Sequence, residues 1–204
     1  MPTNIFLVRH AQSDFSWLED ETRPLTTEAR LDLAEVEQFF SSVSIDSFFS
    51  SPYKRAVDTI SPVAASQLKA IRLDPRFRER TVGTNGQSPE NLKRRWENFH
   101  FSEPGGESLA SVQSRNIEAL TEVLIKNEKK SIVIGTHGTA LSTIINFYEP
   151  NYGLEDFLEI IDLMPYIILL TFSGTQILEI EPKFLIRKEY GGSNNLKTIE
   201  IGRT

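Results

Sequence analysis

Two short apolar runs, each ending at a histidine, constrain the fold of this chain more than any other feature. Residues 4–8 and 131–136 are continuous runs rich in β-forming side chains, and His10 and His137 follow them closely. Such runs are typical of strands buried on both faces of a parallel sheet. If the two strands are neighbours, both imidazoles lie at the carboxyl edge of the sheet, where α/β proteins bind ligands.

Helical and extended patterns alternate along the rest of the chain. Apolar spacing and capping residues predict helices over residues 26–42, 52–69, 89–99, 108–129, 139–148 and 154–160. Pro62 within the second helix predicts a kink, or a restart with Ser61 as cap. Further strands are expected at residues 45–50, 70–73, 166–172 and 176–181, the last two joined as a hairpin at 173–175.

This alternation predicts an α/β fold, a three-layer sandwich with a mainly parallel central sheet and helices on both faces. Regular periodicity is lost at about residues 74–106, which we interpret as an inserted subregion. The length of 204 residues favours one domain spanning 1–204.

Composition excludes several functions. The chain has no cysteine, which excludes disulfides and thiolate chemistry, and its net charge of -6 argues against nucleic acid or anionic membrane as partners. The apolar stretch 160–172 contains Asp162 and Pro165 and is shorter than the ~18–20 residues of a spanning helix. The first residues lack a secretory signal pattern, so we expect a cytoplasmic protein, with a homo-oligomer left open.

The basic and imidazole side chains near the strand ends indicate an anion site. Arg9 adjoins His10, and Arg55 lies where a strand gives way to a helix. Helix N-termini attract anions, and a guanidinium group binds phosphate with two parallel hydrogen bonds. The alternatives are a strand-end histidine bonded to a nearby carbonyl and a solvated surface arginine. Two histidines at matched strand ends favour the functional interpretation.

Six segments in order resemble the histidine phosphatase superfamily, the group that includes cofactor-dependent phosphoglycerate mutases. Residues 7–13 (LVRHAQS) resemble its Arg-His-Gly signature. The other matching segments are 24–26 (PLT), 50–59 (SSPYKRAVDT), 76–83 (RFRERTVG), 105–108 (GGES) and 135–138 (GTHG).

The resemblance implies that the chain is a metal-independent phosphatase without a cofactor, acting on a small phosphorylated metabolite. It implies His10 as the nucleophile that forms a phosphohistidine, and Glu79 as the proton donor to the leaving group. Glu107 is the rival donor, although a first-turn helix carboxylate is the preferred interpretation for it. The phosphate-binding residues that the resemblance implies are Arg9, Arg55, His137 and, in place of the family's asparagine, Ser16. Neighbouring arginines favour an ionised Glu79, which conflicts with proton donation.

Departures from the pattern bear on the type of reaction. Ala11 replaces the usual glycine, which is tolerable unless that position needs positive φ. The reduced insertion favours hydrolysis over mutase-type phosphoryl transfer, which needs an enclosed intermediate. A non-catalytic phospholigand-binding module is a further alternative. We interpret Lys93, Arg94 and Arg95 as a solvated helix face in preference to a second anion site, and His100 as structural.

Overall fold

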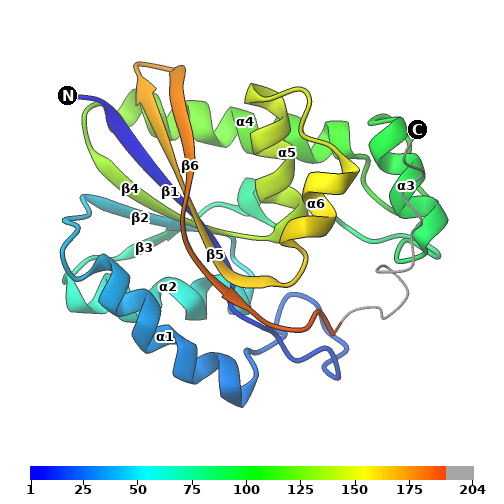
Figure 1. The fold of residues 1–204 in the computed structure, drawn as a ribbon, viewed down its shortest axis with the longest axis horizontal. Helices are drawn as coiled ribbons and strands as arrows, with labels where there is room; N and C mark the ends of the chain where they lie inside the picture. Colours follow the sequence, from blue (N-terminus) through cyan, green and yellow to red (C-terminus); the bar gives the residue numbers. More distant parts are fainter. Residues whose placement is uncertain (192–204) are drawn as a thin grey trace.

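Strand β1 (Thr3–Arg9) lies inside a six-stranded sheet in the computed structural model, which describes residues 1–191 (Figure 1). It pairs in parallel with β4 (Ser131–Thr136), with Arg9 opposite Thr136, and antiparallel with β5 (Leu163–Ser173). The strand order is β3-β2-β4-β1-β5-β6, completed by β2 (Ser47–Ser50), β3 (Ile71–Leu73) and β6 (Gln176–Arg187). The two strands that precede His10 and His137 are therefore neighbours in the sheet.

Helices cover both faces of the sheet (Figure 1). Phe6 and Val8 of β1 pack on the layer of α1 (Thr27–Phe40) and α2 (Lys54–Ser66). Ile5 and Leu7 point to the opposite side and pack on α4 (Leu109–Lys126) and α5 (Gly138–Tyr148). Burial of a side chain of this size stabilises the folded state by roughly 1.5–3 kcal/mol relative to leaving it exposed. The predicted α/β sandwich with a mainly parallel sheet is confirmed.

The region between residues 74 and 106 contains two short helices, η1 (Pro75–Phe77) and α3 (Pro89–Glu97). A separate apolar cluster joins α3 to α6 (Leu154–Ile160) through Leu92, Trp96 and Phe157. Tyr190, close to the last described residue, packs in the same cluster. Segments that lie up to about a hundred residues apart in the sequence thus pack together in one apolar cluster.

The predicted restart at Ser61 and the predicted ends of the last two strands were wrong. Helix α2 runs through Pro62 without a restart, and Ser61 is not a cap because its Oγ donates to the Val57 carbonyl at 2.7 Å. Proline removes one helical hydrogen bond, but burial of Ile60 and Val63 on the sheet retains the helix. Strands β5 and β6 extend beyond their predicted ends because they pair along most of their length, and a register shift accommodates Pro182.

The predicted hairpin is present, with Gly174 at φ +59 in its turn. Glycine adopts this left-handed conformation without the steric cost that a Cβ brings. Nowhere in residues 1–191 is there a helix with the length and apolar character needed to cross a membrane.

Candidate active site

His10 follows β1 and has one defined tautomer. Its Nδ1 lies 2.7 Å from the Ala11 carbonyl oxygen, which can only accept, so Nδ1 carries the proton. Its Nε2 accepts a hydrogen bond from Arg55 Nε at 3.2 Å, so Nε2 carries the lone pair. The Ala11 amide donates to Thr59 Oγ1 at 3.0 Å, which fixes the backbone behind the ring. The non-glycine residues with positive φ in 1–191 are Leu68, Asn85 and Lys129, so Ala11 fits its position without strain.

Arg55 lies in the first turn of α2 and is 2% exposed. Besides His10, its guanidinium contacts the carbonyl and the carboxylate of Asp20, the latter at 3.2 Å. The Asp20 carboxylate also pairs with Arg23 at 2.9 Å. An anion that binds Arg55 must therefore compete with Asp20.

Arg9 ends β1, and its guanidinium is held by main-chain carbonyls at the end of α6. Nη1 donates to Ile160 and, at 3.2 Å, to Leu163, while Nη2 donates to Ile161 at 3.1 Å. Nε is buried and has no hydrogen-bond partner among residues 1–191. One directed donor of this fixed cation thus remains for an anion.

His137 lies beside His10, with ring centroids 5.3 Å apart. It follows β4 and is the N-cap residue of α5. Its Nε2 lies 2.8 Å from Ser51 Oγ, and its buried Nδ1 has no partner within the described chain. The cavity is lined by the next residues, Gly138 and Thr139. The structure thus brings the two histidines together, and direct contact of His137 with phosphate stays a prediction.

Both imidazoles are neutral at neutral pH. Burial lowers the pKa of His10 well below 6.5, and the charges of Arg55 and Arg9 lower it further. Burial, Arg55 and His10 do the same for the pKa of His137. A neutral imidazole keeps the lone pair that a nucleophile requires.

Glu79 lies at the edge of the same cavity. Its Oε1 accepts from the Arg80 amide at 2.7 Å, and its Oε2 accepts from the Thr139 amide at 3.1 Å. Thr139 belongs to the first turn of α5, whose amides have no partner within the helix. The helix therefore positions the carboxyl group.

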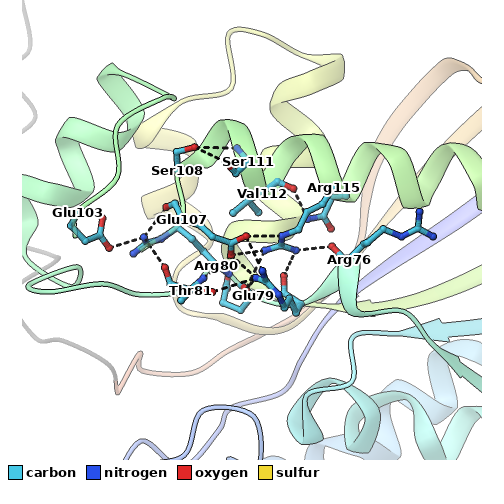
Figure 2. A network of polar contacts seen from close by, with 12 residues as sticks. Arg76, Glu79, Arg80, Thr81, Glu103, Glu107, Ser108, Ser111, Val112 and Arg115 are labelled. Atoms are coloured by element: carbon cyan, nitrogen blue, oxygen red, sulfur yellow. Dashed lines mark hydrogen bonds and ion pairs between the residues drawn. The ribbon is translucent and has the colours of Figure 1, made fainter. Parts of the chain in front are cut away.

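The arginines that flank Glu79 in sequence bind other carboxylates, and Figure 2 shows the pair of Arg80 with Glu103. Arg76 pairs with Asp74 at 2.7 Å, Arg78 pairs with Glu107, and Arg80 pairs with Glu103 at 2.7 Å. Each of these three guanidinium groups is therefore paired with a carboxylate other than that of Glu79.

Glu107 has a structural position. Its carboxylate accepts from Arg78, from the Thr81 amide at 2.9 Å and from Arg115 at 3.1 Å (Figure 2). Burial acts to raise its pKa, but these hydrogen bonds lower it to about 2. Helix α4 begins at Leu109 with Ser108 as N-cap, so Glu107 precedes the helix and is not the first-turn carboxylate expected. It is absent from the cavity lining.

Ser16 is exposed, and its hydroxyl donates to Asp14 Oδ1 at 2.7 Å. The structure does not bring it to the other site residues, because the loop after β1 turns it towards solvent. Ser13 lines the cavity instead, with a buried Oγ that has no partner among residues 1–191. Its place three residues after His10, at the carboxyl end of a buried strand, was the available signal.

Arg95 is not part of a solvated face. It is 4% exposed and bonds to Glu103 at 3.1 Å, whereas Lys93 and Arg94 are exposed. Helix α3 packs by this side on the loop that carries Glu103, which a charge run alone does not indicate. His100 is exposed and lies outside the cavity lining.

Several of the side chains described above line one cavity of about 100 Å³. Arg9, His10, Arg55 and Glu79 all line it. Residues that the sequence did not indicate also line it, namely Ser13, Phe15, Asp20, Arg23 and Tyr190. In the described chain, no three histidine, aspartate or glutamate side chains are grouped as metal ligands.

Comparison with known proteins places this geometry in context. The family model of the histidine phosphatase superfamily (branch 1) matches residues 5–176. No match was found among curated proteins.

Several solved structures share the fold. YhfR of Bacillus stearothermophilus aligns with a TM-score of 0.74 and 21% identity, over 86% of this chain and 94% of its own. A mycobacterial glucosyl-3-phosphoglycerate phosphatase aligns at 0.72 and 15% identity, over 93% and 100%. A mutant of phosphoserine phosphatase from Entamoeba histolytica, in complex with phosphoserine, aligns at 0.71 and 20%, over 90% and 96%.

Proposed function

Because the chain belongs to the histidine phosphatase superfamily, we propose that it is a phosphomonoester hydrolase that forms a phosphohistidine on His10 and needs no metal ion. The substrate is a small phosphorylated metabolite. The observation that carries the proposal is the state of His10, a buried neutral imidazole whose Nε2 lone pair meets the Arg55 guanidinium in the cavity.

The first step transfers the phosphoryl group to His10. Arg55 Nε moves from Nε2 to a phosphate oxygen, which frees the lone pair, and Arg9 Nε and Ser13 Oγ supply further donors. The Nε2–P bond forms as the P–O bond to the leaving group breaks. Positive charge that develops on the ring is stabilised by the bond from Nδ1–H to the Ala11 carbonyl. Charge on the phosphoryl oxygens is stabilised by the two guanidinium groups.

Glu79 acts as the general acid in the first step and as the general base in the second. In the first step its carboxyl group protonates the departing alkoxide, and in the second step the resulting carboxylate takes a proton from water. The water oxygen then attacks phosphorus, and the Nε2–P bond breaks with its electron pair returning to His10. The products are the free alcohol and inorganic phosphate.

The test uses radiolabelled phosphomonoester and rapid quenching. We expect wild-type protein to carry label on His10 and to release inorganic phosphate, with both unchanged by a metal chelator. His10→Ala should lose turnover by at least about a thousandfold while its circular dichroism spectrum is retained. His100→Ala is the matched control, because that histidine is exposed and outside the cavity, and should match wild type.

Other outcomes would overturn the proposal. Substantial turnover by His10→Ala would exclude it as the nucleophile. Transfer of label between two phosphate acceptors without free phosphate would indicate a mutase. Tight binding of vanadate without turnover of any phosphomonoester would indicate a binding module.

A further inference from the structure

The cavity continues beyond the phosphate-binding groups along an apolar wall. This wall is formed by Phe15, Leu92, Trp96, Phe157, Ile161 and Tyr190. Its residues come from the loop after β1, from α3, from α6 and the residue after it, and from the segment after β6. His10 and this wall thus line one cavity.

Tyr190, which lines this cavity, is held in place by neighbouring residues. Its amide donates to Asp162 Oδ1 at 2.9 Å, and the preceding carbonyl of Glu189 accepts from Gln12 Nε2 at 2.7 Å. Its ring meets the Phe15 ring edge-on, with centroids 5.1 Å apart. The wall at this point is therefore preorganised, and binding requires little further ordering of the ring.

The opposite part of the wall is also aromatic and well packed. The Trp96 and Phe157 rings are 5.6 Å apart, and Leu92 and Ile161 beside them are buried. Partly exposed aromatic rings next to buried aliphatic groups form a surface that gains free energy by covering apolar atoms.

The cations on this side of the cavity are already paired. The side chains of Arg80 and Arg95 are each 5% exposed, and both bind the Glu103 carboxylate. Arg23 pairs with Asp20 and lies over the Phe15 ring, 4.7 Å from its centroid. A second anionic group on a substrate would have to replace one of these carboxylates, whereas an apolar group covers the aromatic rings without such a cost.

We propose that this wall is a leaving-group subsite that selects phosphomonoesters of apolar, aromatic-sized alcohols, with Tyr190 as a specificity-determining residue. The inference rests on the proposed function, because it assigns the substrate class of the same cavity.

The test compares the binding of three phosphonates, which keep the phosphate-like head but cannot be hydrolysed. Ethylphosphonate, 2-phenylethylphosphonate and 2-carboxyethylphosphonate differ only at the far end. We expect the phenyl compound to bind wild-type protein at least about tenfold more tightly than the ethyl compound in calorimetry. The carboxylate compound should gain nothing over the ethyl compound.

Variants assign the preference to the wall. Tyr190→Ala should reduce the phenyl-over-ethyl preference at least about fivefold, and Tyr190→Phe should retain it, because the ring and not the hydroxyl makes the contact. Phe147→Ala is the matched control, since Phe147 is an exposed aromatic residue on α5 outside the cavity. It should leave all three affinities unchanged.

The outcomes separate this inference from the proposed function. Equal affinities of the ethyl and phenyl compounds, or preferential binding of the carboxylate compound, would overturn the subsite. A phenyl preference that survives Tyr190→Ala would overturn the role of Tyr190. Phosphonate preferences as expected, together with no hydrolysis of 2-phenylethyl phosphate, would overturn the proposed hydrolase and leave the subsite standing.

Discussion

At the scale of single residues, the arginines next to Glu79 in sequence form their ion pairs with other carboxylates. Arginines flank Glu79 at Arg78 and Arg80, yet each is bonded to another carboxylate, Glu107 and Glu103. The Glu79 carboxylate accepts from the amides of Arg80 and Thr139, whereas Arg78 and Arg115 donate to the Glu79 main-chain carbonyl. A carboxyl group positioned by helix amides and spared from direct ion pairs suits transfer of a proton in both directions.

Replacement of Glu79 tests that role. Glu79→Gln should lower kcat/KM for ethyl phosphate by about 10²–10⁴-fold, because an alkoxide needs a proton to leave. It should lower the value for 2,4-dinitrophenyl phosphate far less, because that phenolate leaves unprotonated. Steady-state kinetics on the two esters provides the measurement, and Glu97→Gln, at an exposed position of α3, is the control. An equal loss on both esters would exclude proton donation.

At the scale of elements, one buried carboxylate connects α3 to the loops around Glu79. The Glu103 side chain is 1% exposed and bonds to Arg80 at 2.7 Å and to Arg95 at 3.1 Å. A Cβ at Gly86 would lie 2.2 Å from its Oε1, so only glycine permits this approach. Burial acts to raise the pKa of Glu103, but hydrogen bonds from main-chain amides and Arg80 lower it to about 2.

Removal of the Glu103 charge should destabilise the region of residues 74–106. Glu103→Gln leaves two buried guanidinium groups without their shared anion, which we expect to cost about 3–5 kcal/mol of the free energy of unfolding. Chemical denaturation monitored by circular dichroism measures this change in the free energy of unfolding. Glu97→Gln, whose partner Lys93 is exposed and 3.7 Å away, should cost less than about 0.5 kcal/mol. Similar losses in the two variants would show that the buried network is not a structural link.

The same elements show what the sequence could and could not predict. Strand β4 and the Thr26 cap of α1 were predictable because burial periodicity and capping depend on neighbours in sequence. The pairing of Arg95 with Glu103 was not, because it depends on how a loop returns to α3. For the same reason Ser16 and Ser13 could be distinguished only once the loop after β1 was seen. Local pattern and the family resemblance thus located His10, His137, Arg9, Arg55 and Glu79, whereas Ser13 and the pairing of Arg95 depended on tertiary contacts.

At the scale of the whole molecule, the two neutral histidines make stability depend on pH. Burial lowers the pKa of both His10 and His137 well below the 6.5 of an unfolded chain. As pH falls through about 6.5, the unfolded chain takes up protons that the folded protein does not, so acid favours unfolding. The buried glutamates, with pKa values of about 2, lose their contribution only at lower pH, below about 4.5.

Denaturation at several pH values tests this linkage. Between pH 6.5 and 5 the free energy of unfolding should fall by up to about 1.4 kcal/mol per pH unit for each buried histidine. His10→Gln should remove about half of that slope, whereas His100→Gln, at an exposed position, should leave it unchanged. A stability that stays flat or rises over this interval would contradict the buried neutral state.

The place of β1 in the sheet also bears on how the protein is made. Both neighbours with which β1 pairs, β4 and β5, lie more than a hundred residues further along the chain. Until β4 and β5 have been synthesised, Ile5 and Leu7 have no neighbouring strands with which to form a sheet. Because His137 follows β4, we expect the pair of imidazoles to assemble only after β4 has been translated and has joined β1.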